Sequence, residues 1–355
     1  MKTLKSVLTQ KNIGCGYLYA YIHFIVEVVC FYYLNKITGG SYIIWLIPFM
    51  YDGLAFVPQS IIGYINDLYP KIRMDYIGVI LLTLAMLLFS LTSISIFISL
   101  ILKCLVNACL HIIGAENTLK NSGGNLSHSA IFVAGGSFGV ITGKLLATTS
   151  IPSYILIPLI LTIIPFIMLA NTYKCDNELK FDYHNKSIPV LLIILGALIV
   201  VIMRGYIGYG IPTSWNKTIF QTILLYVTMG LGKALGGILS DLFGIRKIAV
   251  VSCLLSIPFL CMGNNLMIVS LIGVMMFSMT MPITLALLAS CLKNKPGLAF
   301  GITTIGLFIG TAPIFFIKIT NEIFNLILII SMSLICLIIL LLILKKEKIY
   351  DRINI

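Results

Sequence analysis

Ionisable residues stand inside several long apolar runs of this sequence. His23 and Glu27 lie in the first run, and Asp52 lies in the second. His23 and Glu27 are four residues apart, so they share one face of a helix. A carboxylic acid inside a membrane can load and release a proton when its access to the two sides alternates. The pattern predicts proton coupling, with Glu27 as the first candidate and Asp52 as the second.

Each of these assignments has a structural alternative. Glu27 could pair with a lysine or a histidine, and Asp52 could neutralise Lys103 if the two lie at a similar depth. His111 belongs to the fourth run, near its end. It is a candidate for proton relay, but a helix-capping or structural hydrogen bond explains it about equally well.

Four cations also lie within apolar runs, namely Lys103, Lys144, Arg204 and Lys233. With histidine neutral, they outnumber the two embedded acids. A cavity lined by these residues has an excess of positive charge, which favours anionic or amphiphilic anionic solutes. Lys144 and Arg204 lie toward the ends of their runs, where either could instead extend to the membrane surface.

The composition of the chain indicates that membrane-spanning helices position these residues. The 355 residues are 59% hydrophobic and only 10% charged, with a mean hydropathy of +1.06. A helix needs roughly 20 residues to cross a bilayer, so twelve crossings leave connections of about nine residues each. Connections of this length exclude a membrane-anchored globular enzyme. The apolar runs are continuous, which disfavours a β-barrel. The predicted fold class is all-α integral membrane.

Twelve transmembrane helices are predicted, in two six-helix bundles. A polar, charge-rich linker at 174–187 separates an N-terminal bundle at 1–173 from a C-terminal bundle at 188–355. The helices are expected near 14–35, 42–66, 76–92, 95–116, 128–148, 153–171, 188–208, 217–240, 247–262, 266–289, 297–317 and 323–344.

The distribution of Lys and Arg predicts the orientation. With both termini in the cytoplasm, seventeen of the 24 basic residues fall inside and three fall outside, which matches the positive-inside rule. This topology explains the net charge of +12 without a nucleic-acid partner. The inside residues are Lys2, Lys5, Lys11, Lys71, Arg73, Lys120, Lys174, Lys180, Lys186, Arg246, Lys247, Lys293, Lys295, Lys345, Lys346, Lys348 and Arg352, and the outside ones are Lys36, Lys217 and Lys318.

Neither a metal nor a cofactor is expected. The nine cysteines include no CxxC pair and lie mostly within apolar runs, so they predict neither disulfides nor a metal site. The sequence has no phosphate-binding glycine-rich loop followed by Lys and Ser or Thr, which argues against ATP hydrolysis. The basic N-terminus precedes an apolar run too long for a signal peptide, so we expect a retained first span.

An internal duplication is the most informative pattern in the sequence. A glycine and an acid end the second predicted span, and basic residues follow them. The same arrangement recurs 174 positions later, at the end of the eighth span. The first copy is Gly63, Asp67, Lys71 and Arg73, and the second is Gly237, Asp241, Gly244, Arg246 and Lys247.

These residues resemble the major facilitator superfamily, whose loop between the second and third helices carries G-x-x-x-D-x-x-G-x-R-[KR]. The second copy matches this motif, and the first departs from it at Pro70. An acid at such a helix end can lie near the positive N-terminus of a helix from the other half and pair with a nearby arginine. The motif residues are therefore predicted to form a latch that holds one conformation.

Further segments resemble the fosmidomycin-resistance type of exporter within that superfamily. Asn107 and His111 resemble its fourth-helix segment, although Ile112 replaces the proline that often follows the histidine. The resemblance implies a twelve-helix exporter, a proton-driven mechanism and a phosphonate-like solute. The segments of the tenth and eleventh helices that carry it are Pro282 to Thr284, Leu292, Gly297, Leu298, Ala299, Gly301, Thr303, Gly306 and Gly310.

The same resemblance gives meaning to two other patterns. Spans three, six, nine and twelve carry none of the embedded charges that we considered, and in the superfamily these are the outer, lipid-facing helices. Gly135, Gly139 and Gly143 recur every four residues in the fifth span. They indicate close helix packing, or a hinge or seal between the halves.

The sequence thus predicts a secondary active transporter and no enzyme. We expect a monomer in the inner (cytoplasmic) membrane that exports a small organic solute, anionic if the cavity charge is decisive, by proton-coupled alternating access. Uptake by the same cycle is one alternative. A membrane-embedded enzyme for lipid-linked substrates and a channel are less well supported, since the outside connections hold only Glu322 as an acid and no selectivity filter is evident.

Overall fold

A computed structural model describes residues 3–38, 45–88, 93–173, 179–210, 214–317, 319 and 321–346, without the side chains of 93–95. Five basic residues of the orientation argument lie outside these ranges: Lys2, Lys174, Lys318, Lys348 and Arg352. The linker predicted over 174–187 is described from residue 179 onward.

The described residues form twelve helical crossings, which confirms the predicted fold class. Ten helices or joined helix pairs have the length and apolar composition of a membrane span. The third crossing (Met74–Leu88) is shorter, and the second, Leu46–Phe56 with Pro58–Leu68, is an interrupted pair outside those ten. A short helix, α1 (Leu4–Leu8), precedes them.

The crossings of the N-terminal half are α2 (Ile13–Thr38), α3 (Leu46–Phe56) with α4 (Pro58–Leu68), α5 (Met74–Leu88), α6 (Ser93–Asn121), α7 (Ser127–Ala147), and η1 (Ser153–Ile155) with α8 (Leu156–Leu161) and α9 (Ile163–Ala170). Those of the C-terminal half are α10 (Val190–Gly210), α11 (Ile219–Phe243), α12 (Ile245–Met262), α13 (Met267–Ser278) with α14 (Thr280–Cys291), α15 (Pro296–Thr311) with η2 (Ala312–Phe315), and α16 (Glu322–Ile343).

Three crossings that the sequence predicts as single helices are interrupted, and each interruption is close to a proline. The breaks fall at Val57, Thr162 and Met279. Proline has no N–H for the carbonyl four residues earlier, and its ring crowds that carbonyl. Pro58 starts α4 directly, whereas Pro165 and Pro282 each lie three residues beyond their break.

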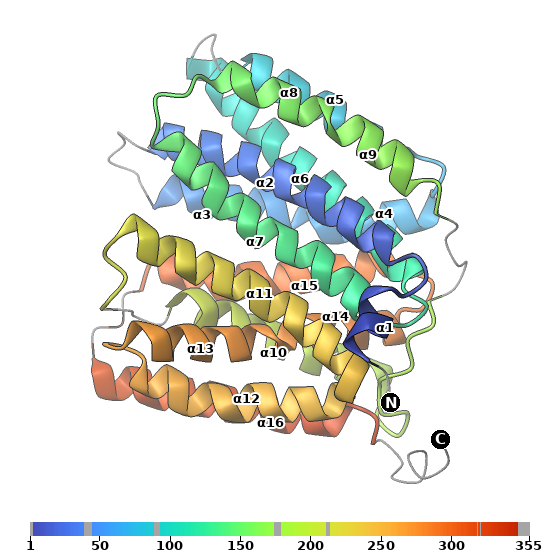
Figure 1. Ribbon diagram of the computed structural model, residues 1–355, viewed down its shortest axis with the longest axis vertical. Coiled ribbons are helices and arrows are strands. Elements are labelled where there is room, and N and C mark those ends of the chain that lie inside the picture. The colour runs from blue at the N-terminus through green and yellow to red at the C-terminus, as the bar shows by residue number, and fades with distance from the viewer. Residues whose placement is uncertain are drawn as a thin grey trace.

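The two halves lie side by side, with the N-terminal half above the C-terminal half in Figure 1. The most extensive contacts between them are those of α7 with α11 and of α4 with α15. The start of α1 and the end of α16 lie at the same end of the bundle, on the right of Figure 1. We call it the linker end, because residues 179–187 cross it.

Within each half, glycines let the central helices approach closely. A Cβ on Gly139 of α7 would lie 2.4 Å from the carbonyl oxygen of Phe24 in α2, and one on Gly310 of α15 would lie 2.1 Å from that of Ile202 in α10. These contacts lie within a half. They give the glycines a packing role, in equivalent helix pairs of the two halves.

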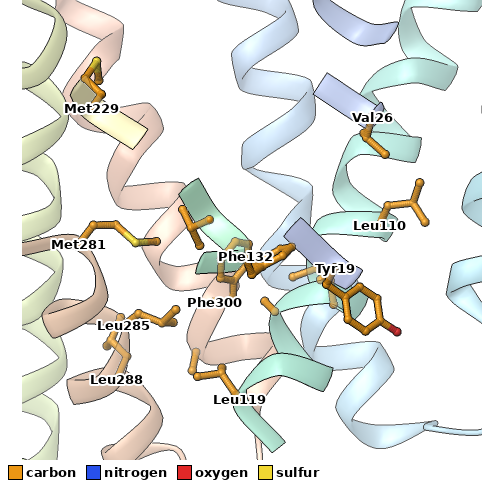
Figure 2. Packing of buried hydrophobic residues seen from close by; sticks show 14 of the residues in the cluster. Tyr19, Val26, Leu110, Leu119, Phe132, Met229, Met281, Leu285, Leu288 and Phe300 are labelled. Carbon is orange, nitrogen blue, oxygen red and sulfur yellow. The ribbon is translucent and has the colours of Figure 1, made fainter. Parts of the chain in front are cut away.

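Near the linker end, buried apolar side chains fill the space between the halves. Phe132 of α7 and Phe300 of α15 have ring centroids 6.0 Å apart. Figure 2 shows these rings at the centre of the packing, with Leu285 and Leu288 of α14 on one side and Tyr19 of α2 on the other. Phe300 of this layer also lines the cavity described next.

Candidate functional site: a charged cavity between the halves

A cavity of about 400 Å³ lies between the two halves. Side chains from both halves line it, and most of them are apolar. Seven of the eight embedded ionisable residues singled out in the sequence are on its wall. These seven are His23, Glu27, Asp52, His111, Lys144, Arg204 and Lys233.

Lys103 is the exception among the predicted cavity residues. Its ammonium donates a hydrogen bond to Ser99 Oγ at 2.5 Å and lies 3.8 Å from the ring centre of Tyr33. The side chain is fully buried inside the N-terminal half and is not among the residues that line the cavity. Asp52, its suggested partner, instead interacts electrostatically with Lys144 and Glu27.

The cations on the cavity wall are each held by a neutral hydroxyl. Lys144 of α7 donates to the Tyr226 hydroxyl of α11 at 2.7 Å. In the opposite direction, Lys233 of α11 donates to Ser137 Oγ of α7 at 2.8 Å. The third bond runs from Arg204 of α10 to Thr284 Oγ1 of α14, at 3.2 Å. Hydroxyls orient these cations without cancelling their charge.

Glu27 lies on the cavity wall between two histidines. Its Oε1 is 3.1 Å from Nε2 of His111 and 3.6 Å from Nε2 of His23. Asn107 donates its amide to the same oxygen at 3.2 Å. Glu27 Oε2 is buried without a hydrogen-bond partner among the described residues. The structure therefore brings together the His23, Glu27 and His111 that the sequence singled out.

The duplicated acids occupy equivalent places at the linker end. Each lies at the end of a helix of one half and accepts two hydrogen bonds from backbone N–H groups at the start of a helix of the other half. Backbone N–H groups at Gly297 (2.9 Å) and Leu298 (2.8 Å) donate to Asp67, and those at Leu126 (2.9 Å) and Ser127 (2.9 Å) donate to Asp241.

The motif glycines allow this approach. A Cβ on Gly63 would lie 2.3 Å from the Gly297 carbonyl oxygen, and one on Gly237 would lie 2.3 Å from the Ala130 Cβ. Gly244 ends α11 and begins α12 with φ +96°, a conformation that favours glycine. Each motif glycine is thus needed either for helix contact or for the turn.

The basic residues of the motif do not make the expected pairs with the motif acids. Arg73 forms a bidentate pair with Asp75, at 3.1 and 2.7 Å. Arg246 donates to the Leu344 carbonyl at 2.9 Å, and Lys247 is exposed. Helix N-termini, and not arginines, are therefore the partners of the motif acids in this conformation.

Sequence reasoning missed Glu116 of α6. Its buried carboxylate pairs with Lys120 and accepts a hydrogen bond from Asn66, the neighbour of Asp67. The available signal was an acid at the last position of the predicted span 95–116, which looks like an ordinary span end.

No family model and no curated protein matches the chain. Solved structures do match it. The fucose:proton symporter of E. coli has a TM-score of 0.63 at 14% identity, covering 93% of this chain and 98% of that one. A second fucose transporter structure, described as outward in conformation, gives 0.59 at 14% identity with coverages of 90% and 98%. The human organic anion transporter MFSD10 gives 0.61 at 11% identity, with coverages of 96% and 100%.

These neighbours are major facilitator superfamily transporters, and the chain has their fold. At such low identity the likeness concerns the fold alone. The cavity between the halves and the duplicated contacts at the linker end are the features of this chain from which a function can be argued.

Proposed function

We propose that this protein is a secondary active transporter that moves a small organic anion across a membrane by alternating access. The observation that carries the proposal is the cavity, which lies between two similar halves and is lined by Lys144, Arg204 and Lys233. A solute bound there contacts both halves, so its binding can depend on how the halves are arranged.

The charge of the cavity supports an anionic solute. A cation at mid-bilayer costs about 2.5 to 3.5 kcal/mol on insertion scales. Arg204 and Lys233 lie close enough to interact electrostatically, and the hydroxyls that hold them supply no negative charge. A carboxylate or phosphonate would offset both. The apolar remainder of the wall suits an organic body attached to that group.

The linker end supports the alternating part of the cycle. Asp67 and Asp241 each bind the start of a helix in the opposite half, so both contacts must break for the halves to separate there. Because the two contacts are equivalent, they act as a paired latch on one conformation. In this proposal the carboxylates of Asp67 and Asp241 form the contacts, and Gly63 and Gly237 allow the helices to approach closely enough.

Proton coupling is proposed through Asp52, the second candidate of the sequence, because the first, Glu27, is already contacted by His111 and Asn107. Its carboxyl lines the cavity, where protons can reach it from the side to which the cavity is open. Protonation would change the charge opposite Lys144 and link the occupancy of the cavity to the proton gradient. The titratable groups that interact with Asp52 come from several helices and are Glu27, Cys104, Lys144, Tyr209 and Tyr226.

We further propose export, from a cytoplasmic face at the linker end. The excess of Lys and Arg at that end supports this orientation, and the resemblance of the tenth and eleventh helices to fosmidomycin-resistance exporters supports the direction. A monomer suffices, because one chain supplies both halves of the cavity.

The test is transport in proteoliposomes with an imposed pH gradient. A panel of organic anions that includes arylphosphonates is compared with neutral and cationic analogues of similar size. Accumulation of an anion that follows the gradient supports the proposal. Flux of cations alone contradicts the solute class, and flux that ignores the gradient contradicts proton coupling.

A matched pair of variants sharpens the test. Arg204→Gln removes a cavity cation, whereas Lys103→Met removes an embedded cation that does not line the cavity. A charge-assisted hydrogen bond contributes about 1.5 to 3 kcal/mol, so Arg204→Gln should weaken anion binding about 10- to 150-fold. Lys103→Met should leave binding unchanged in protein that keeps its melting temperature. Equal effects of the two variants would argue against a direct contact between Arg204 and the anion.

A further inference from the structure

We infer that His23, Glu27 and His111 form a binding site for a divalent transition-metal ion of the zinc class on the cavity wall. The three residues come from α2 and α6 and are buried. Each offers one ligand atom, and the three atoms lie within 4.8 Å of one another. The inference goes beyond the proposed function, since it concerns the ion and not the transported solute.

The two imidazole rings are held in one orientation. His23 Nδ1 is 2.9 Å from the Phe132 carbonyl oxygen, and His111 Nδ1 is 2.7 Å from the Asn107 carbonyl oxygen. A carbonyl only accepts hydrogen bonds, so each Nδ1 carries a proton. In the neutral rings, each Nε2 therefore presents a lone pair. Histidines that bind metals are usually oriented by such a bond from the other ring nitrogen.

Both lone pairs point to an atom that is itself an acceptor. The Nε2 atoms of His111 and His23 are 3.1 and 3.6 Å from Glu27 Oε1. Three acceptors that converge in a buried place repel one another unless a cation lies among them. Asn107 supplies one donor to the carboxylate, but Glu27 Oε2 is buried without a partner among the described residues.

The spacing of these atoms suits a transition metal. Zinc binds His nitrogen and carboxylate oxygen at about 2.0 to 2.2 Å, so two ligands at a tetrahedral angle are roughly 3.4 Å apart. The observed 3.1 and 3.6 Å bracket that separation. Two imidazoles and a carboxylate are also ligands that zinc-class ions accept, whereas magnesium and calcium prefer oxygen.

Three protein ligands leave a coordination position open. His23, Glu27 and His111 all line the cavity, so the open position would face its interior. Sites with three protein ligands commonly bind water or a small molecule in the fourth position. The sequence-based expectation of no metal rested on the cysteine pattern alone. It did not join His23 and Glu27 to a histidine more than 80 positions away.

Metal binding by the purified full-length chain tests the inference. The protein is prepared in detergent with a tag free of histidine and stripped with a chelator, and Zn²⁺ and Co²⁺ are titrated by calorimetry and visible absorption. We expect one saturable ion per chain. Its absence for Zn²⁺, Co²⁺, Ni²⁺ and Mn²⁺ alike would overturn the inference and leave a shared proton as the cation of this cluster.

The four histidines of the chain provide matched variants. His111→Asn and His23→Asn keep a donor close to the position of Nδ1 and remove Nε2. Loss of a single supporting residue already costs about 10- to 100-fold in metal affinity, so each should cost at least about 100-fold. His184→Asn, outside the cavity, should bind normally. Unchanged affinity in both cavity variants would overturn the inference.

A third variant covers the case in which a histidine variant fails to fold. Glu27→Gln removes the anionic ligand with little change in size, and its thermal unfolding is measured without metal beside its affinity. Lost metal binding at an unchanged melting temperature supports the site, and retained binding contradicts it. Because binding is measured without transport, failure here is distinguishable from failure of the proposed function.

Discussion

Lys144 and Lys233 are held by the same two helices in opposite directions. Lys144 reaches from α7 to Tyr226 of α11, and Lys233 reaches from α11 to Ser137 of α7. Both bonds cross between the halves at the cavity, so a change in the spacing of α7 and α11 would disturb both. An anion between them could take over either bond, which would couple its arrival to the arrangement of the halves.

The first prediction at the residue scale concerns Asp52. Asp52→Asn keeps the size of the side chain but removes its charge and its titration. We expect accumulation driven by a pH gradient to fall to background, while exchange of labelled for unlabelled solute continues, because exchange needs no net proton release. The measurement compares the two assays in the same proteoliposomes. Normal accumulation in this variant would show that Asp52 is not the coupling group.

Residue types singled out most of the ionisable side chains that line the cavity, because charge inside a membrane is costly and is kept where it serves a purpose. His23, Glu27 and Asp52 are on the cavity wall, and their role in proton coupling stays a prediction. Tyr226 could not be singled out, since an amphipathic tyrosine in an apolar run gives no signal of its direction. Lys103 could not be placed either, because its burial depends on Ser99 and Tyr33 packing around it.

At the scale of elements, the duplicated carboxylates act through helix ends. An acid that accepts two backbone N–H groups at a helix start is stabilised both by the hydrogen bonds and by the partial positive charge of that end. The prediction is that Asp241→Asn folds but transports poorly, and that Asp67→Asn behaves similarly. The lost stabilisation of about 1 to 3 kcal/mol would shift the balance between conformations by roughly 5- to 150-fold.

Two measurements check the latch. Turnover is compared with the binding constant of the solute, and the distance between labels at the exposed residues 71 and 293 reports separation at the linker end. We expect reduced turnover, near-normal binding and a larger population of separated labels. Normal turnover with reduced affinity alone would contradict the latch.

The described part of the linker makes contacts with both halves. We call residues 179–187 the strap. The Tyr183 hydroxyl donates to the Gly124 carbonyl of the N-terminal half at 2.7 Å. On the other half, His184 Nδ1 is 2.9 Å from Ser290 Oγ, and Asp182 pairs with Lys345 at 2.7 Å. The strap therefore spans the end at which Asp67 and Asp241 contact the opposite half.

The strap predicts a pH effect. Burial lowers the pKa of His184 below its usual 6.5, and this outweighs the opposing charge of Asp182. Neutral His184 therefore stabilises the strap in its contacts with the two halves above pH 6.5. As the pH falls below 6.5, protonation of His184 removes this stabilisation. The hydrogen bond from Lys345 lowers the pKa of Asp182 from 3.8, so the support from that residue is lost only at more acidic pH.

Hydrogen exchange of the strap measures this effect. We expect exchange over residues 179–187 to rise as the pH falls from 7.5 to 5.5, after correction for the intrinsic pH dependence. His184→Gln should flatten the change. If the corrected exchange is the same in both proteins at each pH, His184 does not govern docking.

Helix boundaries were predictable, but helix continuity was not. Apolar runs place α2 and α16 within a few residues of their observed bounds. The break at Met279 depends on Pro282, and a proline in an apolar run can either kink a helix or be absorbed by its neighbours. The packing of neighbouring helices decides between these outcomes, and the apolar sequence around Pro282 does not show that packing.

For the whole molecule, the duplication was the decisive sequence feature. Gly63 and Asp67 recur as Gly237 and Asp241, and in the structure the two copies make equivalent contacts with the opposite half. Two similar halves that bind each other through equivalent elements define a central interface. What the sequence could not supply is which atoms meet there, because the four contacting backbone N–H groups carry no sequence signal.

The last prediction concerns the orientation of the whole bundle. The charge distribution predicts a cytoplasmic linker end, with Lys180 and Lys293 exposed there and Lys217 exposed at the opposite end. An impermeant amine reagent added to intact cells should therefore modify Lys217 alone among the three. Lys180 and Lys293 should react only after the membrane is permeabilised, and mass spectrometry reads out each site.

The control is labelling of the detergent-solubilised protein with the same reagent. All three lysines should react there, which shows that each is accessible to solvent. The reverse pattern in cells would place the latch and the strap on the outer face. The fold and the cavity would be unaffected by that result, but the linker end would face outward. The charge distribution would then no longer support the proposed export.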